Sequence, residues 1–197
     1  MPKGIPLTEE EINRRRHEIF HSSWALIMKQ GFTGTSMQEI AEAAGVGKST
    51  LYDYFPTKDH VLLFVFEEEL DIFQEQAENI AAQEIPAQEK LRKILAAHLE
   101  YLLNNKNFFT EISMQVMQMG QAGQQRIMKK RYAYQDLLCG VLELGVREGT
   151  FRPVNTRLAT RAMSETMEVL VYTTRPTGPP REMLGDVLDI FMHGIET

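Results

Sequence analysis

The chain has 197 residues, of which 43% are hydrophobic, and it carries 21 Lys and Arg against 27 Asp and Glu, a formal net charge of −6. This length suffices for one domain, or for a small domain joined to a larger one. With Cys139 as its single cysteine, the chain cannot form an intrachain disulfide. We find no basic-then-apolar leader and therefore do not expect a secreted protein. The densest apolar run, residues 61–66, is far shorter than the roughly 18 residues that a membrane span needs. We therefore expect an intracellular protein with no membrane partner, and the acidic total at first argues against nucleic acid.

Helical spacing of apolar residues dominates the chain, and no segment alternates apolar and polar residues long enough to predict a sheet. A capping box that begins at Thr8 predicts a first helix, which ends at Gly31. A second capping box predicts a short helix over residues 36–44. A third short helix follows over residues 48–54, and Pro56 ends it because proline disfavours helix in the preceding residue.

Longer helices are predicted in the remainder of the chain, and Asn155 and Pro86 mark two of their starts. They cover residues 59–82, 86–104, 108–119, 121–148, 156–175 and 181–195, with a Pro- and Gly-rich loop at 175–180. The predicted fold class is therefore all-α, with three helices at the N-terminus and a larger helical region after them.

Two of the short helices, joined by a turn that contains Gly45, have the pattern of a helix-turn-helix. Gly45 gives the turn its backbone freedom, and Val46 fills the space between the two helices. The second helix is apolar on one side and polar or small on the other, so its side chains can reach base edges and phosphates in a major groove. We place this motif at about residues 35–54.

The segment from Gly31 to Lys58, which reads GFTGTSMQEIAEAAGVGKSTLYDYFPTK, resembles the DNA-binding domain of the TetR family of transcriptional regulators. The resemblance runs from about Ile12 to Leu63, and Leu51-Tyr52-x-Tyr54-Phe55-x-x-Lys58 is its most specific part. It implies an N-terminal helix-turn-helix DNA-binding domain over residues 1–58. It also implies a larger C-terminal helical domain over residues 59–197, which binds a small effector and dimerises.

Carried over by position, the resemblance implies that Thr35 or Ser36 touches a phosphate, as helix amino ends favour anions. It implies that Lys48 and Ser49 face bases. The remaining implied contacts are to the DNA backbone from Thr50 and Tyr52, to the backbone or a base from Tyr54, and to a phosphate from Lys58.

Asp53 departs from the family pattern, because it puts an acid on the exposed side of the recognition helix. It could accept a hydrogen bond from a cytosine amino group, or it could pair with a neighbouring cation. Both interpretations stay open at this point.

Two motifs typical of enzymes also occur. Residues 17–21 spell HExxH, the zinc-protease pattern, but Trp24 and Ile27 stand where the longer metzincin pattern needs a glycine and a third histidine. Residues 45–50 resemble the end of a phosphate-binding P-loop, but Glu42 stands where its first glycine belongs. We expect no enzyme, no metal and no cofactor, with an HExxH zinc metalloenzyme as the alternative from another class.

The larger region is rich in soft and flat side chains, since the chain has 11 Met, 10 Phe and 6 Tyr. Methionine adapts to irregular partners, so we predict a pocket for an apolar or amphipathic small-molecule effector, although the same spacing also fits an ordinary core. The candidate lining residues are Phe64, Phe73, Phe108, Met114, Met117, Tyr132, Met163, Met167 and Tyr172.

Dimerisation is expected because one short recognition helix buries little surface, whereas a two-fold dimer presents two half-sites about 34–36 Å apart. We predict an interface made by the last two helices of both chains. Its candidate residues are Met163, Met167, Val171, Leu184, Val187, Leu188 and Phe191. Cys139 is predicted to be a small buried residue.

The predicted function is that of a homodimeric repressor that an apolar or amphipathic small-molecule effector releases from a palindromic double-stranded DNA operator, with the helix over residues 59–82 as the coupling element. Whether the effector releases or promotes binding stays open, as does an architectural DNA-binding role without an effector. The charge agrees with DNA binding, since residues 1–58 contain 7 Lys and Arg and 7 Asp and Glu, against 14 and 20 in residues 59–197. The acidic excess therefore lies outside the predicted DNA-binding domain.

Overall fold

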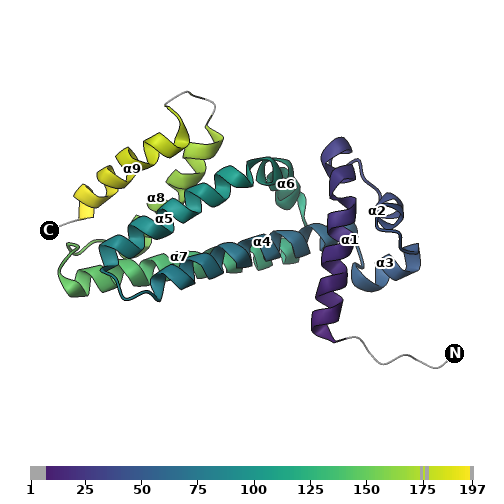
Figure 1. Cartoon of the computed structure of the whole chain (residues 1–197), viewed down its shortest axis with the longest axis horizontal. Coiled ribbons are helices and arrows are strands. Elements are labelled where there is room, and N and C mark those ends of the chain that lie inside the picture. The colour runs from purple at the N-terminus through teal and green to yellow at the C-terminus, as the bar shows by residue number, and fades with distance from the viewer. Residues whose placement is uncertain (1–7, 174, 176–177, 196–197) are drawn as a thin grey trace. The chain divides into compact units, whose positions relative to one another are not determined.

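The structure is a computed structural model that describes residues 8–173, 175 and 178–195. These residues form helices joined by turns and short loops, which confirms the all-α prediction (Figure 1). The helices are α1 (Glu9–Gln30), α2 (Met37–Ala43), α3 (Lys48–Tyr54), α4 (Lys58–Ala81), α5 (Ala87–Asn104), α6 (Lys106–Gln118), α7 (Gln121–Glu148), α8 (Thr156–Tyr172) and α9 (Pro180–Ile195). No helix among the described residues is long and apolar enough to cross a membrane.

The starts of α1 and α2 agree with the prediction because a capping box fixes each of them, whereas the observed starts of α4, α5, α6 and α9 differ from the predicted ones by one or two residues. Thr8 Oγ1 accepts from the Glu11 N–H at 3.2 Å while the Glu11 carboxylate accepts from the Thr8 N–H at 2.8 Å, and Ser36 and Glu39 repeat this box. These hydrogen bonds to the charged carboxylates lower the pKa of Glu11 and of Glu39. The last turn of α8 differs from the prediction, since α8 ends at Tyr172 and part of the predicted loop lies outside the described residues.

The chain divides into two compact units, and each is described by itself. The first comprises Met1–Glu68 and Thr110–Ile127, so helices α1, α2 and α3 share it with the start of α4, most of α6 and the start of α7. Its core is formed by side chains of α1, α2 and α3 that are at most 3% exposed: Ile19, Ile27, Ile40, Leu51 and, just after α3, Phe55. Gly31 (φ 77°) and Gly45 (φ 65°) have positive φ angles, which glycine tolerates, in the turns that separate these helices.

The second unit comprises Glu69–Phe109 and Met128–Thr197. Helix α5 is its centre, since α5 packs against both α8 and α9, which also pack against each other. The buried face of α5 carries Leu91, Leu95 and Leu99, each 0% exposed. The unit boundary lies within α4, between Glu68 and Glu69. The functional division at residue 58 therefore stays a prediction.

The end of α7 offers a test of this packing. A Cβ added at Gly145 would lie 2.2 Å from Cδ2 of Phe151, a ring that is itself only 1% exposed. Gly145→Ala should therefore lower the free energy of unfolding by about 1–3 kcal/mol through overpacking. Urea denaturation of the full chain measures this loss.

Gly140 provides the matched control, because it lies on the same helix and an added Cβ meets nothing within 4 Å. Gly140→Ala should raise the free energy of unfolding by up to about 1 kcal/mol, since alanine favours helix. Equal effects of the two substitutions would contradict the close approach of Phe151 to α7.

Candidate DNA-binding and effector sites

The recognition helix α3 presents its polar side chains to solvent and its apolar side chain to the core. Lys48, Ser49 and Thr50 are exposed, Tyr52 is 41% exposed, and Leu51 between them is 0% exposed. Tyr54 is half-buried at the end of the helix. The structure therefore brings the predicted α3 residues together on one short helix, with Leu51 as the anchor that fixes which face looks outward.

Thr35 and Ser36, the two residues predicted as alternative phosphate contacts at the start of α2, differ in their exposure. Thr35 is 1% exposed, and its hydroxyl donates to the Gly31 carbonyl at 2.8 Å, so it stabilises the turn after α1 and is not placed to contact a phosphate. Ser36 is exposed, and its hydroxyl donates to Glu39 Oε2 at 2.7 Å. A phosphate contact by Ser36 would therefore compete with the Glu39 carboxylate.

Lys58 joins the start of α4 to the turn after α1. Its Nζ donates to the Thr33 carbonyl at 3.0 Å and lies 4.6 Å from the centre of the Phe32 ring. Partial burial lowers the pKa of Lys58, an effect that Asp59 and Glu39 oppose. One of the three ammonium donors is thus engaged, which leaves two for the predicted phosphate.

Thr33 also binds α6, a contact for which the sequence gives no signal. Its hydroxyl donates to Gln115 Oε1 at 2.7 Å across 82 positions of the chain. The carbonyl and the hydroxyl of one residue therefore hold the turn after α1 against two different helices.

Asp53 is exposed, and the described part of the chain offers it no ion-pair partner. The structure thus gives no support to pairing with a neighbouring cation. Acceptance from a base stays a prediction.

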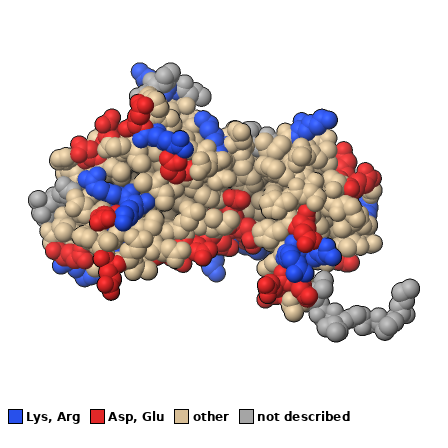
Figure 2. All heavy atoms as spheres, viewed as in Figure 1, with Lys and Arg blue, Asp and Glu red and all other residues tan. Residues whose placement is uncertain are grey.

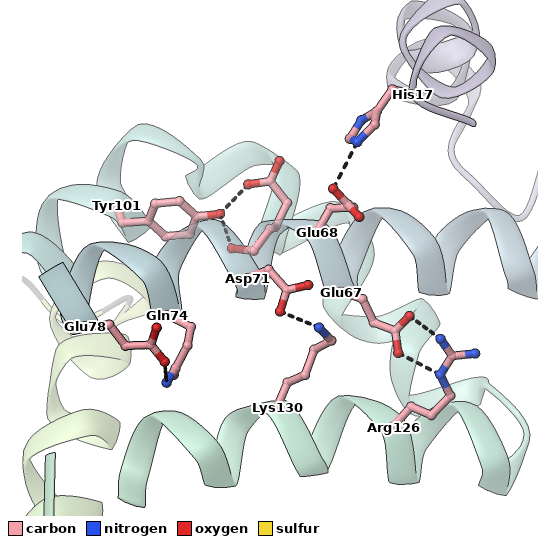
Figure 3. Close-up of polar contacts among 10 residues, drawn as sticks. His17, Glu67, Glu68, Asp71, Gln74, Glu78, Tyr101, Arg126 and Lys130 are labelled. Atoms are coloured by element: carbon pink, nitrogen blue, oxygen red, sulfur yellow. Dashed lines mark hydrogen bonds and ion pairs between the residues drawn. The ribbon is translucent and has the colours of Figure 1, made fainter. Parts of the chain in front are cut away.

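The HExxH histidines lie on α1. His17 Nε2 is 2.9 Å from Glu68 Oε2 on α4 (Figure 3). The ring of His17 also packs edge-on against the Phe64 ring. The His17 and His21 rings are 6.1 Å apart. Among the described residues no group of three or more His, Cys, Asp or Glu side chains could hold a metal ion. One histidine of the motif thus has a packing role within the first unit.

Acidic residues of α4 pair with basic residues of α7 (Figure 3). In the first unit Arg126 binds Glu67 through two hydrogen bonds of 2.7 and 2.6 Å, and in the second unit Lys130 binds Asp71. Figure 2 likewise shows acidic and basic side chains close together over the visible face. Part of the acidic excess of the larger region is therefore neutralised locally.

A cavity of about 310 Å³ lies within the first unit. Its lining comprises Thr57, Asp59, His60 and Leu63 from the start of α4 and Met119, Gly120, Gln121, Ala122, Gly123 and Arg126 from the turn before α7 and its first residues. None of the predicted effector residues whose side chains the structure describes lines this cavity.

The predicted effector residues are divided between the two units. Phe64 is half-buried in the first unit, where its ring packs against Phe55 and His17. Met117 is 78% exposed and Tyr132 55% exposed, so neither lies in a closed pocket of this structure. The others are Phe73, Phe108, Met163 and Met167, which are buried in the second unit, Tyr172, which is half-buried there, and Met114, whose side chain lies outside the described residues. A single pocket that contains all of them stays a prediction.

A buried polar group that the sequence reasoning missed lies at the centre of the second unit. His98 is 6% exposed, and its Nδ1 is 3.1 Å from the hydroxyl of Tyr134. The Phe73 ring packs 4.5 Å from the His98 ring and 4.3 Å from the Tyr134 ring. Burial, with a smaller contribution from Arg131, lowers the pKa of His98 to about 3. The sequence signal for this burial is the position of His98 on the same face of α5 as the buried Leu91, Leu95 and Leu99.

The predicted dimer residues on α8 lie on the inner face of that helix. Met163, Met167 and Val171 are at most 2% exposed in the single chain, so they already belong to its core and have no surface left for a partner. Leu188 is 8% exposed, and Leu184, Val187 and Phe191 of α9 are partly exposed. Apolar spacing identifies a buried stripe without telling whether core or partner covers it, and the dimer interface stays a prediction.

Cys139 is partly exposed rather than buried, which corrects the prediction. Its Sγ lies 3.3 Å from Thr156 Oγ1 and 3.6 Å from Glu143 Oε1.

Comparison with known proteins identifies the family. Residues 19–65 match the model of bacterial regulatory proteins of the tetR family, and residues 84–195, more than half of the chain, match the tetracyclin repressor-like C-terminal domain. The chain belongs to the TetR family. It is therefore a DNA-binding transcriptional regulator and not an enzyme, and the zinc metalloenzyme alternative is not favoured.

Similar TetR proteins cover nearly the whole chain. The fatty acid metabolism regulator protein of Bacillus subtilis (strain 168) is 25% identical over 182 residues, which are 90% of this chain and 94% of that protein. The transcriptional repressor KstR2 of Rhodococcus jostii (strain RHA1) is 25% identical over 173 residues, which are 83% of this chain and 81% of that protein. The crystal structure of the transcriptional regulator FadR from Bacillus subtilis in complex with stearoyl-CoA resembles this chain with a TM-score of 0.77, at 24% identity over 91% of this chain and 99% of that chain.

The exposed position of Lys48 on α3 predicts a change of base preference on substitution. Lys48→Ala should cost about 1–3 kcal/mol at the base pair that Lys48 contacts and relax the preference there. Sequencing of duplexes that the full-length protein selects from a random pool measures the preference. Lys29→Ala, which removes one exposed charge from the end of α1, should select the wild-type sequence. The same selected sequence for Lys48→Ala would contradict a base contact.

The burial of neutral His98 predicts a pH dependence of stability. Its pKa of about 3 in the fold lies below its ordinary value of 6.5, so between these values the unfolded chain binds more protons. This group therefore leaves stability unchanged above pH 6.5 and lowers it as the pH falls towards 3. Relative to His98→Gln, the free energy of unfolding of the wild type should decline by up to about 1.4 kcal/mol per pH unit in that window. Urea denaturation at several pH values measures the free energy of unfolding of both proteins. An equal change with pH in the wild type and in His98→Gln would contradict the prediction.

Proposed function

We propose that this TetR protein is a homodimeric repressor that acts in the cytoplasm, binds a palindromic operator and is released from it by a long-chain acyl-CoA. The observation that carries DNA recognition is the face of α3, where Lys48 and Ser49 are exposed beside the fully buried Leu51. The similarity to KstR2, a transcriptional repressor, supports repression. The similarity to a fatty acid metabolism regulator supports the class of effector.

An acyl-CoA matches the predicted effector chemistry, because it joins an apolar chain to a polar and anionic group. The stearoyl-CoA in the FadR structure is a molecule of this type. In the second unit, Gln74 Oε1, Thr160 Oγ1 and Tyr172 OH are buried without a hydrogen-bond partner among the described residues. Since buried polar groups are normally satisfied, these atoms could accept or donate to the polar parts of such a ligand.

Helix α4 is the proposed coupling element. It begins at Lys58, which holds the turn after α1 through the Thr33 carbonyl, and continues past Asp71, which Lys130 of α7 binds. An effector that binds one arrangement of α4 better than another shifts the population towards it. Release from the operator follows if that arrangement changes the spacing of the two recognition helices.

The proposed dimer interface uses the outward faces of α8 and α9. Leu158 and Val169 on α8 are 65% and 61% exposed, and Ile190 on α9 is 70% exposed. Exposed apolar side chains of this size on neighbouring helices are suited to burial against a second copy. In the proposed interface these exposed residues take the place of Met163 and Met167, which face the core of the single chain.

Stearoyl-CoA should raise the melting temperature of the full-length protein and weaken its binding to a selected operator duplex. Ligand at about 100 times its Kd adds about 2.7 kcal/mol to the stability of the state that binds it. Differential scanning fluorimetry and fluorescence anisotropy measure the two effects. Free CoA serves as the control and should produce neither, because it lacks the apolar chain.

A thermal response only to small sugars or to highly charged metabolites would contradict the proposed effector class. Tighter operator binding in the presence of stearoyl-CoA would contradict release while leaving the ligand class intact.

A further inference from the structure

Helix α3 lacks the usual means of fixing its own ends. It has seven residues, no side-chain hydrogen bond at its N-cap Gly47 and no basic residue in its last turn. A helix of this length is not stable alone in water. Its orientation therefore depends on contacts from the helices that surround it.

Arg16 of α1 supplies such a contact at the C-terminal end of α3. Its Nε donates to the main-chain carbonyl of Tyr54 at 3.2 Å, across 38 positions of the chain. Its guanidinium carbon lies 5.8 Å from the centres of both the Phe55 and the Phe64 rings. A cation at the C-terminus of a helix satisfies a free carbonyl and interacts favourably with the helix dipole.

The neighbouring arginines differ from Arg16 in their partners. Arg15 is exposed and pairs with Glu18 on α1 at 2.7 Å, and Arg14, also exposed, approaches the same carboxylate at 4.0 Å. Both pairs lie within one helix. The three consecutive basic residues therefore carry equal charge, but Arg16 alone among them has a described contact with α3.

We infer that Arg16 is a positioning residue for DNA recognition, which acts on the bases through the backbone of Tyr54 and not by touching DNA. A seven-residue helix is about 10 Å long, so a tilt of about 10° at its C-terminal end moves its first residue by about 2 Å. Lys48, at the first position of α3, is the predicted base contact. A displacement of this size breaks a hydrogen bond between a side chain and a base edge.

The experiment compares Arg16→Met with Arg15→Met in the full-length protein. Each substitution removes one positive charge from α1, so their long-range effects on DNA phosphates match. Anisotropy gives the Kd for a duplex selected from a random pool by the wild type and for a shuffled duplex of the same composition. Arg16→Met should weaken binding to the selected duplex about tenfold, in line with the loss of a charge-assisted hydrogen bond. For the shuffled duplex, the Kd of the Arg16→Met protein should equal that of the Arg15→Met protein. Arg16→Lys, which keeps a cationic donor, should recover most of the specificity.

Amide exchange gives a readout on α3 itself. The Phe55 N–H bonds to the Leu51 carbonyl and closes the last turn of the helix. In Arg16→Met this amide should exchange with solvent faster than in Arg15→Met, under conditions where both proteins are folded.

Two results would overturn the inference. A direct phosphate contact by Arg16 would make Arg16→Met weaken both duplexes equally and reduce the salt slope of binding by about 1, with no change for Arg15→Met. A purely stabilising role would lower the melting temperature of Arg16→Met while leaving the ratio of the two affinities at the wild-type value.

Discussion

The DNA-binding part of this protein is governed by the shortness of its recognition helix. Seven residues close too few hydrogen bonds to hold a helix together, so α3 takes its stability from outside. Leu51 and Phe55 anchor it to the core at 0% and 1% exposure, and Arg16 holds its last carbonyl. These anchors leave the polar face of α3 exposed to solvent, where it can contact DNA.

The helical core of the second unit contains hydrogen-bonded polar side chains. His98 and Tyr134 satisfy each other, and the Tyr101 hydroxyl donates to the carbonyl and the carboxylate of Glu69. Such pairs restrict how α4, α5 and α7 can pack, since a shift of any one helix would leave a buried donor or acceptor unpaired. The Thr160 hydroxyl on α8, which has no hydrogen-bond partner among the described residues, stands apart from this pattern.

Local chemistry made the helices predictable, and long-range packing limited the prediction of the site. The capping boxes at Thr8 and Ser36 and the glycines at 31 and 45 act within a few residues, so the sequence shows them directly. The family resemblance likewise located the residues of α3. Contacts such as Thr33 with Gln115 join positions far apart in the chain, and no local pattern reports them.

Burial was the other quantity that the sequence left undetermined. Thr35 and Ser36 are adjacent and chemically alike, yet one is buried and the other exposed, because the turn after α1 consumes the first hydroxyl. Met163 and Val169 of α8 are both apolar, yet one faces the core and the other solvent. Periodicity separates such faces only when the orientation of the helix is known.

The two attachments of Thr33 differ in how they can change during evolution. Lys58 binds its main-chain carbonyl, which every amino acid possesses, whereas Gln115 binds its hydroxyl, which only a few side chains could replace. A mutation at position 33 can therefore remove the attachment to α6 while the attachment to α4 persists. In related regulators the contact with α6 could therefore be lost or changed by substitution at this position. The contact with α4 would persist as long as the lysine on α4 is kept.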